Sequence, residues 1–263
     1  MFKRVVMVNV LVFSALVLAI GGSSCPTTLP TPVDPAAYTS ANRVTGGLLY
    51  DKWWKAAGLA EPTGDHPLWA SRPDTTSNTR TGPDTWRCKE CHGWDYTGVS
   101  GAYGTGSHKT GVVGIFGTTK TAQELFDLIK THHSYGTAGL SDTNIWDLAK
   151  FAKEGLIDTN TIINSTSKAF LGTAATGQTL YANSIGTNAA CTSCHGTDGK
   201  TLNFATPPET EYVGTIAADN PWELQHKIRF GNPGSAMPSL INGGGTNQNV
   251  SDLGAHCQTL PQS

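Results

Sequence analysis

The sequence contains two short motifs in which a pair of cysteines is followed directly by a histidine. Both have the pattern C-x-x-C-H, at residues 88–92 and 191–195. The side chains concerned are Cys88, Cys91, His92, Cys191, Cys194 and His195. Cysteine sulfur can form thioethers, disulfides or metal thiolates, and an imidazole ring can ligate a metal ion. Each motif therefore brings two linkable sulfur atoms and one metal ligand together within about one helical turn.

The repeated motif is the attachment signature of haem c. Two thioether bonds to the vinyl groups fix a helical turn against the porphyrin edge, and the following histidine points a ring nitrogen at the iron. A four-cysteine zinc site has its pairs about 15–20 residues apart, whereas 99 residues lie between Cys91 and Cys191. Disulfides would not need a histidine after each pair, and a thioredoxin-like site needs a βαβ context. We therefore expect two covalently bound haem c groups.

An internal repeat surrounds the two motifs, which indicates two copies of one structural unit. Each copy opens with a helical segment that ends in Leu-Tyr, at residues 46–50 and 177–181. Each continues after its motif with an amphipathic helix that contains Glu-Leu, expected at residues 123–130 and 222–229. The two copies therefore share the order of their elements as well as the motif.

Each copy then ends in a closing helix that begins at a Ser-Asp pair. We expect these helices at residues 141–153 and 251–260, with the Ser-Asp pair as the cap. This order of helices resembles the class I cytochromes c, and the resemblance covers about residues 44–263. It implies an all-α fold of two tandem helical domains, at residues 44–165 and 166–263, each built around one covalent haem c.

The first copy contains an insertion that the second lacks. From Tyr50 to Cys88 is 38 residues and from Tyr181 to Cys191 is 10, which leaves a 28-residue insertion before the first motif. We expect an extended loop that wraps the first haem, with a docking surface for a partner as the alternative. The large ring side chains of this region are Trp53, Trp54, His66, Trp69 and Trp86.

Met237 is the candidate sixth ligand of the second iron. The other two methionines, Met1 and Met7, belong to the N-terminal leader. Met237 precedes a proline and lies 42 residues after His195, in the distal loop where the class I cytochromes c place their axial methionine. The resemblance therefore implies His195 and Met237 as the two axial ligands of the second haem.

The first iron needs a different sixth ligand, because Ala138 occupies the place that corresponds to the methionine. His133 lies 41 residues after His92 and is the expected ligand, with His132 as the alternative. His108, 16 residues after His92, is a third candidate, although its position suits a bond to a propionate or a backbone group better. An open sixth position is the remaining alternative. A thioether raises the potential of haem iron, so we expect the first haem to have the lower potential.

The N-terminus has the three-part layout of an export signal. Two basic residues precede an apolar run at residues 5–20, and small residues follow. Residues 1–24 are interpreted as a signal peptide, and Cys25 as the acylated cysteine of a segment that resembles a lipoprotein signal. The apolar run is short for a spanning helix of about 20 residues, and an uncleaved anchor is the alternative. Residues 25–43, rich in Pro, Thr and Ala, are expected to form a flexible tether.

Three residues of the second copy are assigned no ligand role. Cys257 falls where the first copy has Phe151, and we expect it to be a small buried apolar side chain. His226 and His256 are expected at the surface or in packing, because the second iron already has two ligands.

The net charge of −2 offers no basic surface for nucleic acid. We interpret the chain as a protein exported to the periplasm or the outer face of the cell envelope and tethered to the membrane. It would pass single electrons between redox partner proteins and would not be an enzyme. One alternative is a dihaem oxidoreductase, similar to a peroxidase or a thiosulfate dehydrogenase, with an open site at the first haem. Another is a cytochrome subunit of a respiratory complex.

Overall fold

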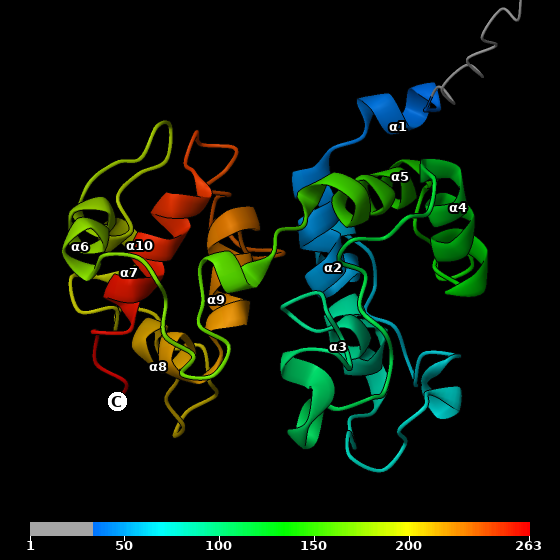
Figure 1. The fold of residues 1–263 in the computed structure, drawn as a ribbon, viewed down its shortest axis with the longest axis horizontal. Coiled ribbons are helices and arrows are strands. Elements are labelled where there is room, and N and C mark those ends of the chain that lie inside the picture. Colours follow the sequence, from blue (N-terminus) through cyan, green and yellow to red (C-terminus); the bar gives the residue numbers. More distant parts are fainter. Residues whose placement is uncertain (1–33) are drawn as a thin grey trace, which may run out of the picture. The chain divides into compact units, whose positions relative to one another are not determined.

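The computed structural model describes residues 34–263, which consist of helices joined by loops (Figure 1). The expected signal peptide, Cys25 and the first part of the expected tether lie outside this part of the chain. No strand occurs within residues 34–263, which confirms the all-α class. No helix in this range is long and apolar enough to cross a bilayer.

The first half of the described chain carries helices, single 3-10 turns and two π-helical turns, the latter labelled η5 and η6. Its elements are α1 (Ala36–Ser40), α2 (Arg43–Ala57), η1 (Trp69–Ser71), η2 (Gly82–Trp86), α3 (Cys88–His92), η3 (Ala102–Gly104), η4 (Gly106–His108), α4 (Ala122–Asp127), η5 (Leu128–His132), α5 (Asp142–Lys150) and η6 (Phe151–Gly155). The second half contains η7 (Thr159–Thr161), α6 (Ala174–Ala182), α7 (Thr192–His195), α8 (Val213–Asp219), α9 (Pro221–Phe230) and α10 (Asn247–Cys257).

The opening and closing helices of each half cross at a glycine. In the first half α2 packs on α5, and in the second α6 packs on α10 (Figure 1). A Cβ atom on Gly46 would overlap the carbonyl oxygen of Asp147, and one on Gly177 would overlap that of Asp252. Only glycine therefore permits this close approach of the two helix backbones.

The same aspartates also fix the start of each opening helix. Asp147 Oδ1 accepts a hydrogen bond from the backbone N–H of Asn42 at 2.6 Å. Asp252 Oδ1 accepts one from the backbone N–H of Thr173 at 2.7 Å. In each half, a carboxylate of the closing helix thus accepts a hydrogen bond from a backbone N–H at the start of the opening helix. The first N–H groups of a helix have no partner within the helix itself. Both halves use this contact, which matches the internal repeat.

The prediction for the start of the last helix was correct in the first half and wrong in the second. Ser141 accepts a hydrogen bond from the N–H of Asn144 and caps α5. Helix α10 begins four residues earlier than expected, with Thr246 as its cap. Ser251 and Asp252 lie buried inside the helix. Asp252 is needed there to bind the start of α6, so the Ser-Asp pair is not a cap.

This difference also changes which residue corresponds to Phe151. A Cβ atom on Gly46 would meet Cβ of Phe151, and one on Gly177 would meet Cβ of His256. His256 therefore occupies the place expected for Cys257, and it packs on Tyr181 with ring centroids 5.1 Å apart. Cys257 is 3% exposed, which fits the buried apolar role expected for it.

Part of the expected tether packs on the first half. Residues 36–40 form α1, and the ring of Tyr38 lies edge-on to Trp146 with centroids 6.3 Å apart. The Tyr38 hydroxyl donates a hydrogen bond to Glu154 Oε1 at 2.5 Å. A buried tyrosine with a satisfied hydroxyl stabilises one position of this segment. Here the structure differs from the expectation of a flexible tether.

Polar contacts join α2 of the first half to α9 of the second. His226 is fully buried, donates through Nε2 to the Gly47 carbonyl at 2.9 Å, and accepts at Nδ1 from the Tyr96 hydroxyl at 2.9 Å. Asp51 forms ion pairs with both Arg87 and Lys227. His226 was expected either at the surface or in packing, and the structure shows it in packing. The division into two domains at residue 165 stays a prediction.

Candidate haem sites

Helix α3 carries the first motif as a single helical turn. Cys88 and Cys91 are unpaired and half-buried, and Cys88 Sγ lies 3.5 Å from the Tyr135 hydroxyl. Burial raises the pKa of Cys88 to about 11 and that of Cys91 to about 12, so both sulfurs are protonated at neutral pH. The turn ends at Gly93 with a positive φ of 78°. The two thiols are available on one short turn, as thioether formation requires.

The rings of His92 and His133 lie close to each other. Their ring centroids lie 6.2 Å apart, with 53° between the ring planes. An imidazole nitrogen binds a metal ion at about 2 Å, and the ring centre lies about 1 Å further out. Two imidazoles on opposite sides of one ion therefore have centroids about 6 Å apart. The observed separation fits one iron held between these two rings.

The hydrogen bonds of both rings leave the same nitrogen free. His92 Nδ1 donates to the Val113 carbonyl at 2.7 Å, and His133 Nδ1 donates to the Leu128 carbonyl at 3.1 Å. A carbonyl only accepts, so each neutral ring carries its lone pair on Nε2. Burial lowers the pKa of His92 to about 4 and also lowers that of His133. Both rings are therefore neutral at pH 7, which is the form that binds a metal.

A π-helical turn distinguishes His133 from its neighbour His132. The N–H of His133 donates to the carbonyl of Leu128, five residues earlier, at 2.9 Å. This wider turn places His133 half-buried and opposite His92, whereas His132 is exposed. Turns of this kind occur frequently at functional sites. The geometry therefore suits His133 as a ligand better than His132.

His108 belongs to a polar network and not to the gap between His92 and His133. Its Nδ1 donates to Glu90 Oε1 at 3.2 Å, and its Nε2 accepts from the Arg80 guanidinium at 3.2 Å. Glu90 is fully buried and also pairs with Lys89. Both ring nitrogens of His108 are thus engaged by protein groups.

His66 was not singled out from the sequence as a functional residue, and it contacts the backbone of His133. Its Nδ1 accepts from the backbone N–H of Leu68 at 3.1 Å, so its Nε2–H donates to the His133 carbonyl at 3.0 Å. The ring is buried and packs edge-on against Trp86, with centroids 4.6 Å apart. The one signal in the sequence was a histidine within a tryptophan-rich insertion. The insertion therefore helps to fix the position of His133.

Helix α7 carries the second motif in a more open setting. Cys191 is half-buried and Cys194 is exposed. His195 Nδ1 is buried and has no hydrogen-bond partner within residues 34–263, and burial lowers the pKa of the ring. The motif ends at Gly196 with a φ of 75°, close to that of Gly93. Both motifs thus need a glycine after the histidine, because the chain turns there into a left-handed conformation.

Met237 lies in the loop after α9. The loop turns at Gly231, where φ is 89°, and returns to the helix through a hydrogen bond from Leu240 N–H to the Ile228 carbonyl at 3.0 Å. Met237 is half-buried, and its backbone N–H donates to Ser235 Oγ at 3.2 Å. Its thioether is a soft, uncharged ligand of the kind that binds haem iron.

Apolar side chains remain exposed beside both motif histidines. Val113, whose carbonyl accepts from His92, is 70% exposed, and Phe116 in the same loop is 44% exposed. Phe204 is 44% exposed, and its ring lies 6.1 Å from that of His195. These apolar side chains fit a large apolar plate such as a porphyrin against each histidine.

Comparison with protein families gives one match, which lies in the second half. Residues 172–256 match the family model described as cytochrome C oxidase, cbb3-type, subunit III. The match includes the second motif and Met237, and it supports a class I cytochrome c domain in this segment. Such a domain binds haem c and transfers electrons. Neither curated proteins nor solved structures gave a match.

Proposed function

We propose that the chain is an exported dihaem c-type cytochrome that passes single electrons between redox partner proteins. When bound, haem c supplies a one-electron couple between ferric and ferrous iron. Cys88 and Cys91 would hold the first haem and Cys191 and Cys194 the second. The protein would be located in the periplasm or on the outer face of the cell envelope. The lipid on Cys25, or an uncleaved N-terminus, would tether it to the membrane.

The observation that carries this proposal is the pair formed by His92 and His133. The family match covers only the second motif, so the case for a first haem depends on the first half itself. There the two rings lie 6.2 Å apart, each with Nδ1 engaged by a carbonyl and Nε2 free. Two protein ligands on one axis leave no site for a substrate on the iron, which favours electron transfer over catalysis.

The two irons would differ in their sixth ligand. His92 and His133 would bind the first iron, with His132 as the alternative, and His195 and Met237 would bind the second. A thioether raises the potential of the iron, and a second imidazole gives a lower one. The first haem would therefore have the lower potential. An electron would reside preferentially on the second haem.

Removal of either cysteine pair tests the number of haems. Wild-type protein is expected to contain two haems per chain by pyridine haemochrome assay and intact mass. Replacement of Cys88 and Cys91 by alanine should leave one haem, and so should replacement of Cys191 and Cys194, because each pair forms two covalent bonds. Cys257→Ala is the matched control and should retain both. Two haems retained after loss of the first pair would contradict the proposal.

A second candidate function is a cytochrome subunit of a respiratory complex. The family model that matches residues 172–256 is named for a subunit of a cbb3-type oxidase, which favours this candidate. The haem ligands would be the same, and the partner would be a stable complex instead of a mobile carrier. Purification from membranes under mild detergent separates the two: a stoichiometric oxidase partner supports the subunit, and isolation of the chain alone supports the carrier.

A further inference from the structure

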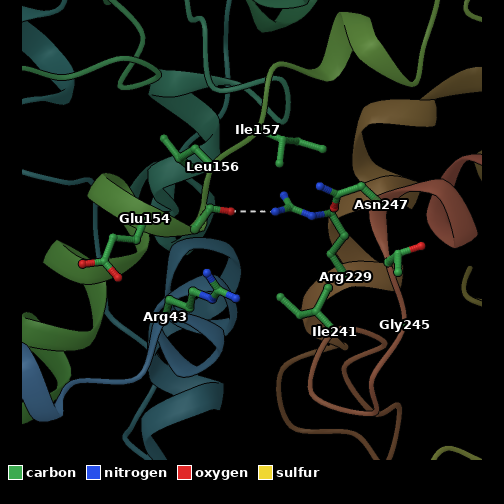
Figure 2. Close-up of a pocket in the computed structure, with 10 residues that line it drawn as sticks. Arg43, Glu154, Leu156, Ile157, Arg229, Ile241, Gly245 and Asn247 are labelled. Carbon is green, nitrogen blue, oxygen red and sulfur yellow. Dashed lines mark hydrogen bonds between the residues drawn. The ribbon is translucent and has the colours of Figure 1, made fainter. Parts of the chain in front are cut away.

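A polar cavity of about 420 Å³ lies between the end of η6 in the first half and the helices α9 and α10 in the second (Figure 2). Residues of the first half that line it include Arg43 at the start of α2 and Glu154 and Gly155 of η6. The second half contributes Arg229 of α9 and Asn247 at the start of α10. None of the motif cysteines or histidines lines this cavity, and neither does Met237. It is therefore separate from both candidate haem sites.

Arg229 is a buried cation without a counter-ion in the described part of the chain. Its side chain lines the cavity and is 4% exposed. One guanidinium nitrogen donates to the Gly155 carbonyl at 2.7 Å (Figure 2), while Nε and Nη1 find no acceptor within residues 34–263. The nearby Tyr96 hydroxyl also interacts with the guanidinium, but it donates its proton to His226 Nδ1 and is neutral, so it does not compensate the positive charge of Arg229. Arginine does not lose its proton at physiological pH, so the charge persists in this site.

A second guanidinium faces the same cavity. Arg43 is exposed and, among residues 34–263, forms no salt bridge. Burial lowers the pKa of Arg229, and the positive charge of Arg43 lowers it further. The two cations are therefore close enough to repel each other. The one acidic lining residue, Glu154, accepts a hydrogen bond from the Tyr38 hydroxyl instead of pairing with either arginine. The lining therefore carries an excess of positive charge.

Burial of a charge with unpaired N–H groups is strongly unfavourable unless an opposite charge compensates it. A small anion with several oxygens would accept from Nε and Nη1 of Arg229 and from Arg43. The 11-residue helix α10 begins at Asn247, which lines the cavity. The positive end of its helix dipole also favours an anion there. We propose that this cavity binds a small oxyanion from solution, of the sulfate or phosphate kind, between Arg229 and Arg43. Because these arginines belong to different halves, the anion would link the two halves together.

The test is a sulfate titration of the holoprotein at constant ionic strength, with sodium chloride replaced by sodium sulfate. Wild-type protein is expected to show saturable binding by calorimetry and a matching rise in melting temperature. R43Q should weaken sulfate binding by about tenfold or more, because a hydrogen bond to a charged group contributes that much. R229Q should abolish binding. K120Q removes a cation from an exposed site elsewhere and should bind sulfate as the wild type does.

Arg43 is exposed, so R43Q is expected to fold. It therefore decides the outcome if R229Q does not fold. The absorption spectrum of each variant measures its haem content independently of sulfate binding. A failure of the proposed dihaem function would therefore be distinguished from a failure to bind sulfate. Sulfate that acts no differently from chloride would overturn the proposal, and so would unchanged binding in R43Q. If wild-type protein binds no sulfate but E154Q does, a carboxylate of the chain is the counter-ion, and this outcome too would overturn it.

Discussion

The two halves present the same five-residue motif in different surroundings. In the first half, His92 has an engaged Nδ1 and a facing imidazole, His133, that the insertion supports through His66. In the second half, His195 Nδ1 has no partner within the described chain, and Cys194 is exposed. Both motifs nevertheless end in the same way, at a glycine with positive φ. The chain outside the motifs differs in the candidate ligand that it supplies, His133 in the first half and Met237 in the second.

Asp51 of the first half forms an ion pair with Lys227 of the second. Its replacement therefore tests whether the two halves form one folded unit. Burial alone would raise the pKa of Asp51, but Lys227 and Arg87 hold the pKa well below its usual range. Replacement by asparagine leaves both cations without their buried partner and should lower the free energy of unfolding by about 3–5 kcal/mol. Denaturant unfolding followed by helix content and by haem absorbance measures this loss.

The same ion pairs predict a pH dependence. A carboxylate with a lowered pKa stabilises the fold above its unfolded-state pKa of about 4. Its contribution is lost as the pH falls further toward the folded-state pKa. The stability of the wild type should therefore decline below about pH 4, and the difference between the wild type and D51N should shrink there. A difference that does not depend on pH in this range would contradict the role of the charge.

His133→Met converts the first site to the ligand type proposed for the second. The potential of the first haem should rise by on the order of 0.1 V, since axial ligands tune haem potentials over about 0.8 V. The second potential should stay the same. Spectroelectrochemical titration measures both. H132M is the matched control because His132 is exposed, and a shift in H132M but not in H133M would transfer the ligand role to His132.

Met237→His is the reciprocal change in the second site. It replaces the thioether by an imidazole, which should lower the second potential by on the order of 0.1 V. The two midpoints should then approach each other, and the asymmetry between the halves should disappear. A second potential that does not move on this substitution would show that Met237 does not bind the iron.

His66→Ala should produce the smallest of these effects, and only in the first half. It removes the hydrogen bond to the His133 carbonyl, and a buried acceptor left unpaired costs about 1–3 kcal/mol. The first haem should become partly high-spin in the ferric state because its ligand is less firmly held. H66Q can still donate and should restore most of the low-spin signal. Equal change at both haems would mean that His66 acts only on overall stability.

Much of the fold was predictable from the sequence because its signals are local. The helix at Ser141 follows from a cap with a matching hydrogen bond one turn on. The start of α10 could not be predicted in this way, because Asp252 binds the start of α6, which is distant in sequence, instead of capping its own helix. Likewise, the π-helical turn holds His133 close to His92, and only the path of the insertion brings His66 to the His133 carbonyl. Such contacts depend on tertiary structure, which spacing alone does not define.

The most direct test of the account is a near-infrared magnetic circular dichroism spectrum of the ferric holoprotein. Charge-transfer bands in this region distinguish an iron bound by two imidazoles from one bound by an imidazole and a thioether. Both band types are expected in equal amounts, with both irons low-spin. A single band type for both irons, or a high-spin signal from the first, would contradict the proposed pairing of His92 with His133 and of His195 with Met237.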